Sequence, residues 1–224
     1  MEKVIDKKAA IDLIKSGDSI MVGGFGMAGC PMNLVYELVS RNDLEHLTLI
    51  SEGFLDGRLP WDEGFSGMLP KHMLDKIIVS FFGNPKAQKY VDSGEIELEL
   101  SPMGTLAERI RAGGAGLGGF FTPTGAGTIV EEGKETRIID GRKYVFEKPL
   151  HANVALIKAE KADRYGNGQF AYTANNFNTA MATAADIVIL ECHELVECGE
   201  LHPNFVQLPG VFVDYVVECK EVRF

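Results

Sequence analysis

The 224-residue sequence lacks any apolar run approaching the ~20 residues that a membrane-spanning helix requires. It is also short of basic residues, with 22 Lys and Arg against 32 Asp and Glu and a net charge of −10. An acidic chain is a poor partner for nucleic acid or an anionic membrane surface. Its hydrophobic fraction of 46% is too high for a disordered chain. We therefore expect a globular protein whose partners are neither nucleic acid nor a membrane.

Cysteine is scarce and unpaired in the sequence, with four residues and no C-x-x-C motif. Cys192 and His193 are adjacent, but without a second pair of ligands nearby they make a poor zinc site. Residues 1–6 contain no apolar core of a signal peptide. We therefore expect a cytoplasmic protein with reduced thiols and no metal.

Short apolar segments alternate with amphipathic segments through most of the chain. The apolar segments predict strands at residues 19–22, 47–51, 76–82, 96–100, 153–159, 187–192 and 211–219. Predicted helices follow Asp6, Pro31 and Asn84, begin at a Thr105/Glu108 capping box, and cover residues 179–185. This alternation is typical of an α/β fold with a largely parallel sheet covered by helices on both faces. Because no repeat or linker interrupts it, we expect one domain over residues 1–224.

Two polar segments have local interpretations. Asp140-Gly141, between two apolar segments, predicts a hairpin with a type I′ turn. The asparagine-rich segment 175–178 suits either a helix cap or a loop that faces substrate, and we favour the cap because a helix follows at once.

A glycine loop follows the first predicted strand and precedes a helix. Residues 24–29 match G-x-G-x-x-G, in which glycines let the backbone approach an anion near a helix N-terminus. Glu52, after the next strand, stands where a dinucleotide fold places its ribose ligand. The pattern alone leaves two alternatives open, namely NAD binding and glycines that serve packing only. Residues 114–119 match the same expression but follow a helix, so there we expect a packed or flexible loop.

Several longer segments resemble the A (alpha) subunit of class I 3-oxoacid CoA-transferases, of the acetate/butyrate–acetoacetate type. The resemblance is carried by residues 18–31, 104–116, 121–128 and 150–159, with shorter matches at 176–178, 184–186 and 209–211. These segments occur in order over nearly the whole chain, which is far more specific than one glycine loop. The resemblance therefore takes precedence over the NAD interpretation, and it implies a CoA-transferase-like α/β fold.

The resemblance implies a two-subunit enzyme that moves CoA between a short-chain acyl-CoA and a carboxylic acid such as acetoacetate, butyrate or acetate. In this family the thioester is attacked by a glutamate of the B subunit, which later carries CoA as a glutamyl thioester. This chain would accordingly hold no catalytic residue and would assemble with a B subunit in a hetero-oligomer. The residues it would contribute to CoA binding are Gly23, Gly24, Phe25, Gly26, Met27, Ala28 and Gly29.

Two positions depart from the pattern of the resembling subunits. Glu52-Gly53 stands where they carry an Asn-Asn pair, and Met103 stands where they carry glutamine. Fewer amide donors and a soft apolar side chain would suit a more apolar acyl group such as butyryl. Ser51-Glu52-Gly53 also resembles the segment that holds the nucleophile in B subunits, so Glu52 either mirrors that nucleophile or fixes a loop or a substrate hydroxyl by hydrogen bonding. We favour the second interpretation, and a non-catalytic pseudo-subunit remains a further alternative.

Overall fold

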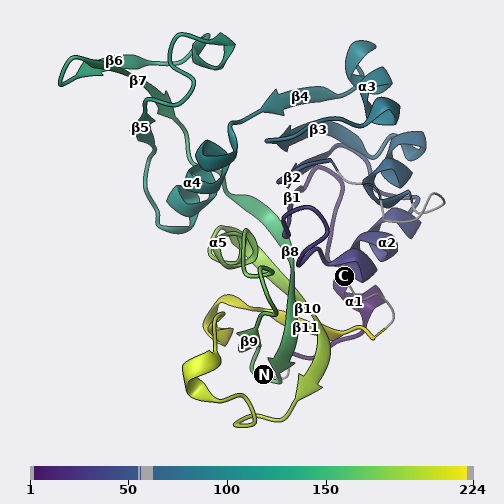
Figure 1. Ribbon diagram of the computed structural model, residues 1–224. Helices are drawn as coiled ribbons and strands as arrows, with labels where there is room; N and C mark the ends of the chain where they lie inside the picture. Colours follow the sequence, from purple (N-terminus) through teal and green to yellow (C-terminus); the bar gives the residue numbers. More distant parts are fainter. Residues whose placement is uncertain (1–2, 55, 57–62, 221–224) are drawn as a thin grey trace.

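The structure is a computed structural model that describes residues 3–54, 56 and 63–220. Within those residues, a sheet of eight strands runs through the centre of the molecule (Figure 1). Its parallel path is β11 (Tyr215–Glu218), β10 (Ala185–Val196), β8 (Ala152–Asp163), β1 (Ser19–Val22), β2 (Leu47–Ser51), β3 (Leu74–Val79) and β4 (Glu97–Leu100). The short strand β9 (Gly168–Gln169) pairs antiparallel with β8. The prediction of a largely parallel sheet is confirmed.

Helices cover both faces of this sheet, because its strands bury apolar side chains on both sides. In β1, Ile20 and Val22 belong to one apolar cluster, whereas Met21 between them belongs to the other. The first cluster is covered by α1 (Lys7–Ile11), α2 (Met32–Ser40), α3 (Pro85–Asp92) and the 3₁₀ helix η1 (Gly64–Lys71). The second is covered by α4 (Met103–Gly114) and α5 (Asn178–Ala182).

A smaller antiparallel sheet extends away from the main sheet beyond α4 (Figure 1). Its order is β5 (Phe120–Thr122), β7 (Arg142–Glu147) and β6 (Thr136–Ile139). Asp140 and Gly141 both have positive φ, +50° and +79°, as the predicted type I′ turn requires. Three short 3₁₀ helices complete the described chain, namely η2 (Ile129–Glu131), η3 (Pro203–Phe205) and η4 (Gly210–Phe212).

Several predicted boundaries are wrong, each for a local reason. The helix α4 begins at Met103, with Pro102 at the N-cap, so the Thr105/Glu108 capping box lies inside the helix. Pro102 sets the start because its fixed φ, here −52°, suits a helix entrance. β8 and β10 are each 12 residues long, since they pair along ten positions, and β11 is shorter than predicted because η4 precedes it. The sequence pattern did not reveal η1.

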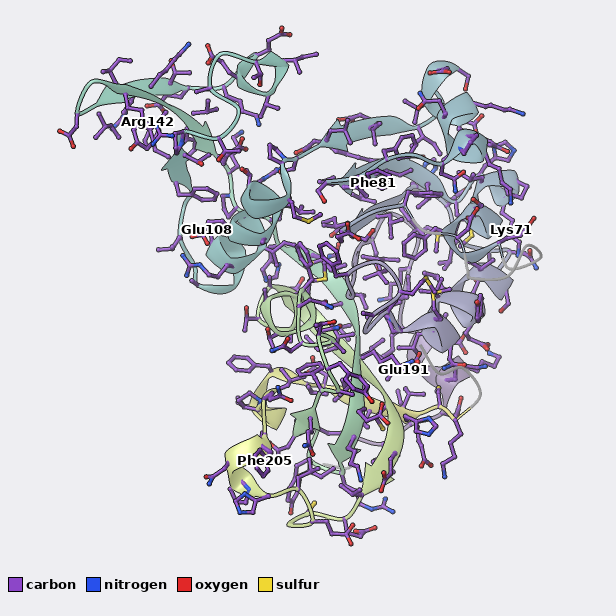
Figure 2. All side chains as sticks on the ribbon, viewed as in Figure 1. Lys71, Phe81, Glu108, Arg142, Glu191 and Phe205 are labelled. Carbon is purple, nitrogen blue, oxygen red and sulfur yellow. The ribbon has the colours of Figure 1, made fainter. Side chains whose placement is uncertain are left out.

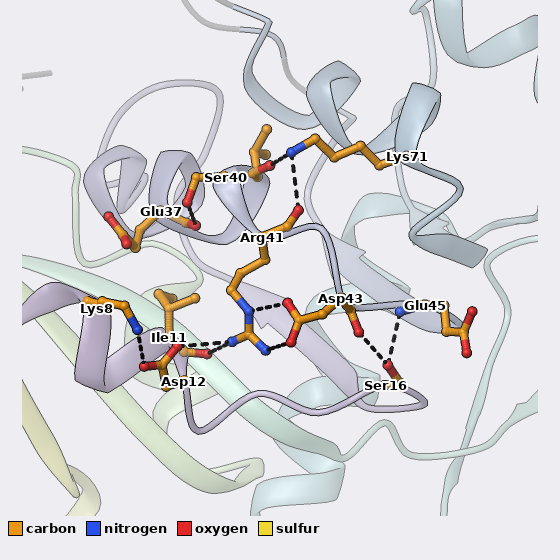
Figure 3. Close-up of polar contacts among 11 residues, drawn as sticks. Lys8, Ile11, Asp12, Ser16, Glu37, Ser40, Arg41, Asp43, Glu45 and Lys71 are labelled. Atoms are coloured by element: carbon orange, nitrogen blue, oxygen red, sulfur yellow. Dashed lines mark hydrogen bonds and ion pairs between the residues drawn. The ribbon is translucent and has the colours of Figure 1, made fainter.

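A network of polar contacts holds the amino edge of the sheet, where β1 and β2 begin (Figure 3). Arg41, at the end of α2, donates to both oxygens of Asp43 at 2.6 Å and to the carbonyl of Ile11 at 3.0 Å. The hydroxyl of Ser16 accepts a hydrogen bond from the backbone of Glu45. These contacts are exposed or partly buried and tie α1 to α2, leaving the opposite edge of the sheet for the glycine loop.

Candidate functional site

The glycine loop of residues 23–29 follows β1 directly, at the carboxyl edge of the parallel sheet. Phe25 and Ala28 close it by exchanging backbone hydrogen bonds of 3.0 and 3.1 Å, and the backbone N–H of Gly23 donates to the carbonyl of Leu156 on β8. Among the described residues, the backbone N–H groups of Gly24, Met27 and Gly29 have no hydrogen-bond acceptor. Open α/β sheets bind ligands at this edge. The loop therefore offers free backbone donors where such folds receive a ligand.

Two glycines of the loop have different physical reasons to be glycine. A Cβ at Gly29 would lie 2.6 Å from the carbonyl oxygen of Ala174, so this position serves close packing. A Cβ at Gly26 would have no atom within 4 Å, although its φ of +55° is unfavourable for other residues. The loop is thus packed at its end and open at its centre.

Amides of the segment 175–178 support the loop from below. The fully buried side chain of Asn178 donates to the carbonyls of Gly29 and Ala174, at 3.0 and 2.7 Å, and accepts from the backbone of Lys158 at 3.0 Å. Asn176 donates to the carbonyl of Ala28 at 2.9 Å.

The prediction that the segment 175–178 is a helix cap is wrong, because the N-cap of α5 is Phe177, which has no side-chain cap bond. Asn178 instead gives the Gly29 carbonyl a donor, and Asn176 adds a second donor to the Ala28 carbonyl, which already accepts from Phe25.

A buried carboxylate occupies the N-terminus of α2, the helix that follows the loop (Figure 2). Glu191 on β10 accepts from the backbone of Leu34 at 3.1 Å and from the amide of Asn33 at 2.9 Å, and its Oε1 lies 3.2 Å from the Lys158 ammonium. Burial raises the pKa of Glu191, and Lys158 opposes that effect. A dinucleotide fold places its pyrophosphate at this same helix terminus, so the protein's own carboxylate argues against NAD here. A single glutamate within the apolar strand 187–192 was the sequence signal for this contact.

Cys30, between the loop and α2, is not a candidate nucleophile. Its thiol is fully buried, and burial together with the nearby Glu191 raises its pKa to about 12. A thiol with that pKa is protonated at neutral pH and therefore unreactive.

The two positions that depart from the resembling subunits lie together beside the loop. The Glu52 side chain, in a residue only 7% exposed, accepts a hydrogen bond of 2.9 Å from the backbone N–H of Gly26 through Oε2. Its backbone carbonyl accepts from the hydroxyl of Ser80 at 2.7 Å, and that hydroxyl also lies 3.1 Å from the sulfur of Met103. Ser80 joins the two departures at the carboxyl ends of β2 and β3, and no sequence motif indicated it.

The second glycine-rich segment has a packing role at its start. A Cβ at Gly113 would collide with the carbonyl of Leu150, and one at Gly114 with the side chain of Thr183. These glycines let the end of α4 lie directly against the residues before β8 and after α5. Within the match at residues 114–119, only Gly114 and Gly119 are closely packed, whereas a Cβ at Gly116 or Gly118 would have no atom within 4 Å and residues 115–118 are exposed. The packed expectation therefore holds at the two ends of this segment and not in its middle.

The fold and the loop together define the class of the protein, an open and mostly parallel α/β subunit with a glycine loop at the carboxyl edge of its sheet. The coenzyme A transferase family matches residues 4–219, and the chain belongs to that family. It is 42% identical over 224 residues to the alpha subunit of the acetate CoA-transferase of Escherichia coli, covering 99% of both chains. It is 45% identical over 212 residues to the A-type chain of the 3-oxoadipate CoA-transferase of Pseudomonas putida, covering 93% of this chain and 90% of the relative. The acetoacetyl-CoA:acetate/butyrate CoA transferase alpha subunit of Clostridium acetobutylicum is 42% identical over 217 residues, with 96% and 97% covered.

Solved structures share the fold at lower identity. An acyl-CoA transferase from Escherichia coli, solved as a thioester complex with CoA, has a TM-score of 0.88 and 22% identity. The match covers 99% of this chain and 48% of that one, so the present chain spans about half of it. The glutaconate coenzyme A-transferase of Acidaminococcus fermentans has a TM-score of 0.80 and 22% identity, with 96% and 75% covered.

These comparisons confirm the resemblance drawn from the sequence and identify the chain as a CoA-transferase subunit of the A type. The family assignment replaces the NAD interpretation of the loop. The binding role of residues 23–29 stays a prediction, as does the location of the nucleophile on a partner chain.

Proposed function

We propose that this subunit supplies the CoA-binding loop of a two-subunit enzyme that transfers CoA between a short-chain acyl-CoA and a carboxylic acid such as acetoacetate, butyrate or acetate. The observation that carries the proposal is the loop itself, in which the N–H groups of Gly24, Met27 and Gly29 have no acceptor among the described residues and no described atom lies within 4 Å of a Cβ at Gly26. Two relatives of 42% identity are named for transfers that involve acetate, acetoacetyl-CoA or butyrate.

The reaction proceeds through covalent catalysis by a glutamate of the B subunit. Its carboxylate attacks the thioester carbonyl and the C–S bond breaks. CoA departs as a thiolate, and the acyl group remains on the glutamate as a mixed anhydride. The thiolate then attacks the glutamyl carbonyl and releases the first acid, so that a glutamyl-CoA thioester remains. An acceptor carboxylate reverses these steps and departs as the new acyl-CoA. In this scheme the loop holds CoA while the acyl group is exchanged.

Exposed aromatic rings around the loop support a partner that covers the site. Phe25 in the loop and Phe81 after β3 are 51% and 63% exposed, and Tyr172, on the segment before α5, is fully exposed. Hydrogen bonds place these segments near one another. The backbone N–H of Phe81 donates to the carbonyl of Glu52, whose side chain accepts from Gly26, and Asn176 on the segment before α5 donates to the carbonyl of Ala28. Exposed aromatic side chains beside a binding loop are typical of a protein interface. We place the B subunit there, with the active site between the two chains.

Three further expectations remain proposals. The chain forms one domain over residues 1–224, it acts in the cytoplasm, and its reaction uses CoA as substrate without a metal. In the described part of the chain, no three His, Cys, Asp or Glu residues are grouped as a metal site would require. No helix of that part is long and apolar enough to span a membrane.

Co-expression with the B subunit encoded in the same genome tests the proposal. The B subunit, this chain and the purified complex are each assayed with pairs of acyl-CoA and carboxylic acid. We expect stable co-purification and CoA transfer by the complex alone. Transfer by the isolated chain would contradict the shared active site. A complex that forms but transfers CoA between no pair would favour the alternative of a non-catalytic pseudo-subunit.

A further inference from the structure

Glu52 is a buried carboxylate that pairs with no cation among the described residues. Its residue is 7% exposed, and within the described chain its side chain has one partner, the backbone N–H of Gly26 on Oε2. No Lys, Arg or His of the described residues forms an ion pair with it, in contrast to Glu191, which lies against Lys158. A buried carboxylate usually has a paired charge or several donors, so one N–H leaves most of its charge uncompensated.

The groups around Glu52 do not reduce this charge. Ser80 donates its hydroxyl to the backbone carbonyl of Glu52, not to the carboxylate. Met103 is apolar and lies beyond Ser80, with its sulfur near the same hydroxyl. None of these described contacts places a positive charge at the carboxylate, and its one hydrogen bond directs its negative potential at the centre of the loop.

The position of this charge matters because Gly26 is where the loop is open. The Glu52 carboxylate accepts a hydrogen bond from the backbone N–H of Gly26. A Cβ added to Gly26 would have no described protein atom within 4 Å. An acyl group bound in that space has the negative charge of Glu52 as a neighbour. A neutral aliphatic acyl group is compatible with that charge, whereas an acyl group that ends in a second carboxylate is repelled.

We propose that Glu52 selects acyl groups by charge, favouring neutral short-chain acyl groups over those that carry a second carboxylate. This inference rests on the proposed function, since it requires the acyl group to lie beside the loop. Two unit charges at ~6–8 Å and an effective dielectric constant of about 20 repel each other enough for roughly a 30- to 100-fold preference.

Butyryl-CoA and succinyl-CoA are matched probes, because the acyl groups have the same chain length and differ in a methyl against a carboxylate. The purified A–B complex is assayed with each donor and a common acceptor, and the ratio of the two kcat/KM values is compared between variants. Glu52→Gln removes the charge but keeps an oxygen that accepts from Gly26, whereas Glu52→Asp keeps the charge. Glu160→Gln, at an exposed position on β8, is the control for the same change in net charge.

We expect wild type, Glu52→Asp and Glu160→Gln to prefer butyryl-CoA, and Glu52→Gln to lower that preference by about tenfold or more. A role limited to fixing the loop predicts an unchanged ratio in Glu52→Gln, and that result overturns the inference. Should Glu52→Gln fail to assemble, the wild-type complex alone still tests the inference. Equal kcat/KM values for succinyl-CoA and butyryl-CoA in the wild type would overturn it. In both cases the complex still transfers CoA, so the proposed function stands. Absence of transfer with every donor contradicts the proposed function instead.

Discussion

Gly26→Val tests most sharply whether the loop of residues 23–29 binds CoA. A Cβ at this position would have no protein atom within 4 Å, so the first side-chain atom causes no collision in the fold. Its cost comes from the backbone, since φ is +55° and an L-residue in that conformation loses about 1–2 kcal/mol. For a protein of this length, that strain corresponds to a fall in Tm of roughly 2–8 °C.

Gly17→Val is the matched control for this strain. Gly17 also has a positive φ, +86°, and no atom within 4 Å of a Cβ, but it precedes β1 at the opposite edge of the sheet. Both variants therefore carry similar backbone strain, whereas the valine at position 26 alone fills the space beside the loop.

Calorimetric titration of CoA into the A–B complex, with thermal melting in parallel, separates the two effects. We expect Gly26→Val to raise the Kd for CoA at least tenfold, which is about 1.4 kcal/mol. Gly17→Val should leave the Kd unchanged despite a comparable fall in Tm. If both variants bind CoA like the wild type, or lose binding equally, the loop does not bind CoA and its glycines serve packing alone.

Two further predictions concern the support of the site and of the sheet. Asn178→Ala removes hydrogen bonds to Gly29, Ala174 and Lys158 and should lower the free energy of unfolding, measured in urea, by roughly 2–4 kcal/mol. Asn204→Ala, at an exposed position, is the control and should change the free energy of unfolding little. Equal effects of the two variants would refute the role of Asn178 in supporting the loop. Burial opposes ionisation of Glu99, but Lys76 and Arg109 outweigh that effect and hold the pKa of Glu99 below its ordinary value of 4.5. The ionised Glu99 therefore stabilises the fold above pH 4.5, and its contribution is lost as the pH falls through the folded-state pKa. Glu99→Gln should therefore lower Tm at pH 7 and have less effect at pH 3, and a Tm difference independent of pH would contradict the assignment.

The parallel sheet and its helices could be predicted because apolar periodicity and cap residues act locally. Asp6 and Asn84 cap α1 and α3 as their sequence positions indicate, each accepting backbone hydrogen bonds of the first turn. The Asp140-Gly141 turn is likewise fixed by two adjacent residues. The start of α4 could not be placed correctly, because a capping box and Pro102 competed within four residues and the proline set the boundary.

The candidate site was predictable in its loop and not in its supports. Residues 23–29 lie where a strand–loop–helix pattern puts them, but Asn178 reaches this loop across about 150 residues of sequence, which no local pattern encodes. The asparagine segment predicts a cap from sequence, because asparagine both caps helices and bonds loop carbonyls, and only the fold decides between these roles. Glu52 and Met103 stand out in the sequence as departures, while their connection through Ser80 required the sheet that aligns the ends of β2 and β3.

The location of the covalent intermediate gives the most direct test of the proposed mechanism. The A–B complex is incubated with acyl-CoA and treated with borohydride, which reduces a glutamyl thioester to an alcohol but leaves a free carboxylate intact. The modified residue is then mapped by peptide mass spectrometry, with the isolated chain treated in parallel. We expect an unmodified Glu52 in both samples, because Glu52 serves the loop as a hydrogen-bond acceptor, together with a reduced glutamate on the B subunit. Reduction of Glu52 itself would contradict the mechanism and would make this chain the carrier of the nucleophile.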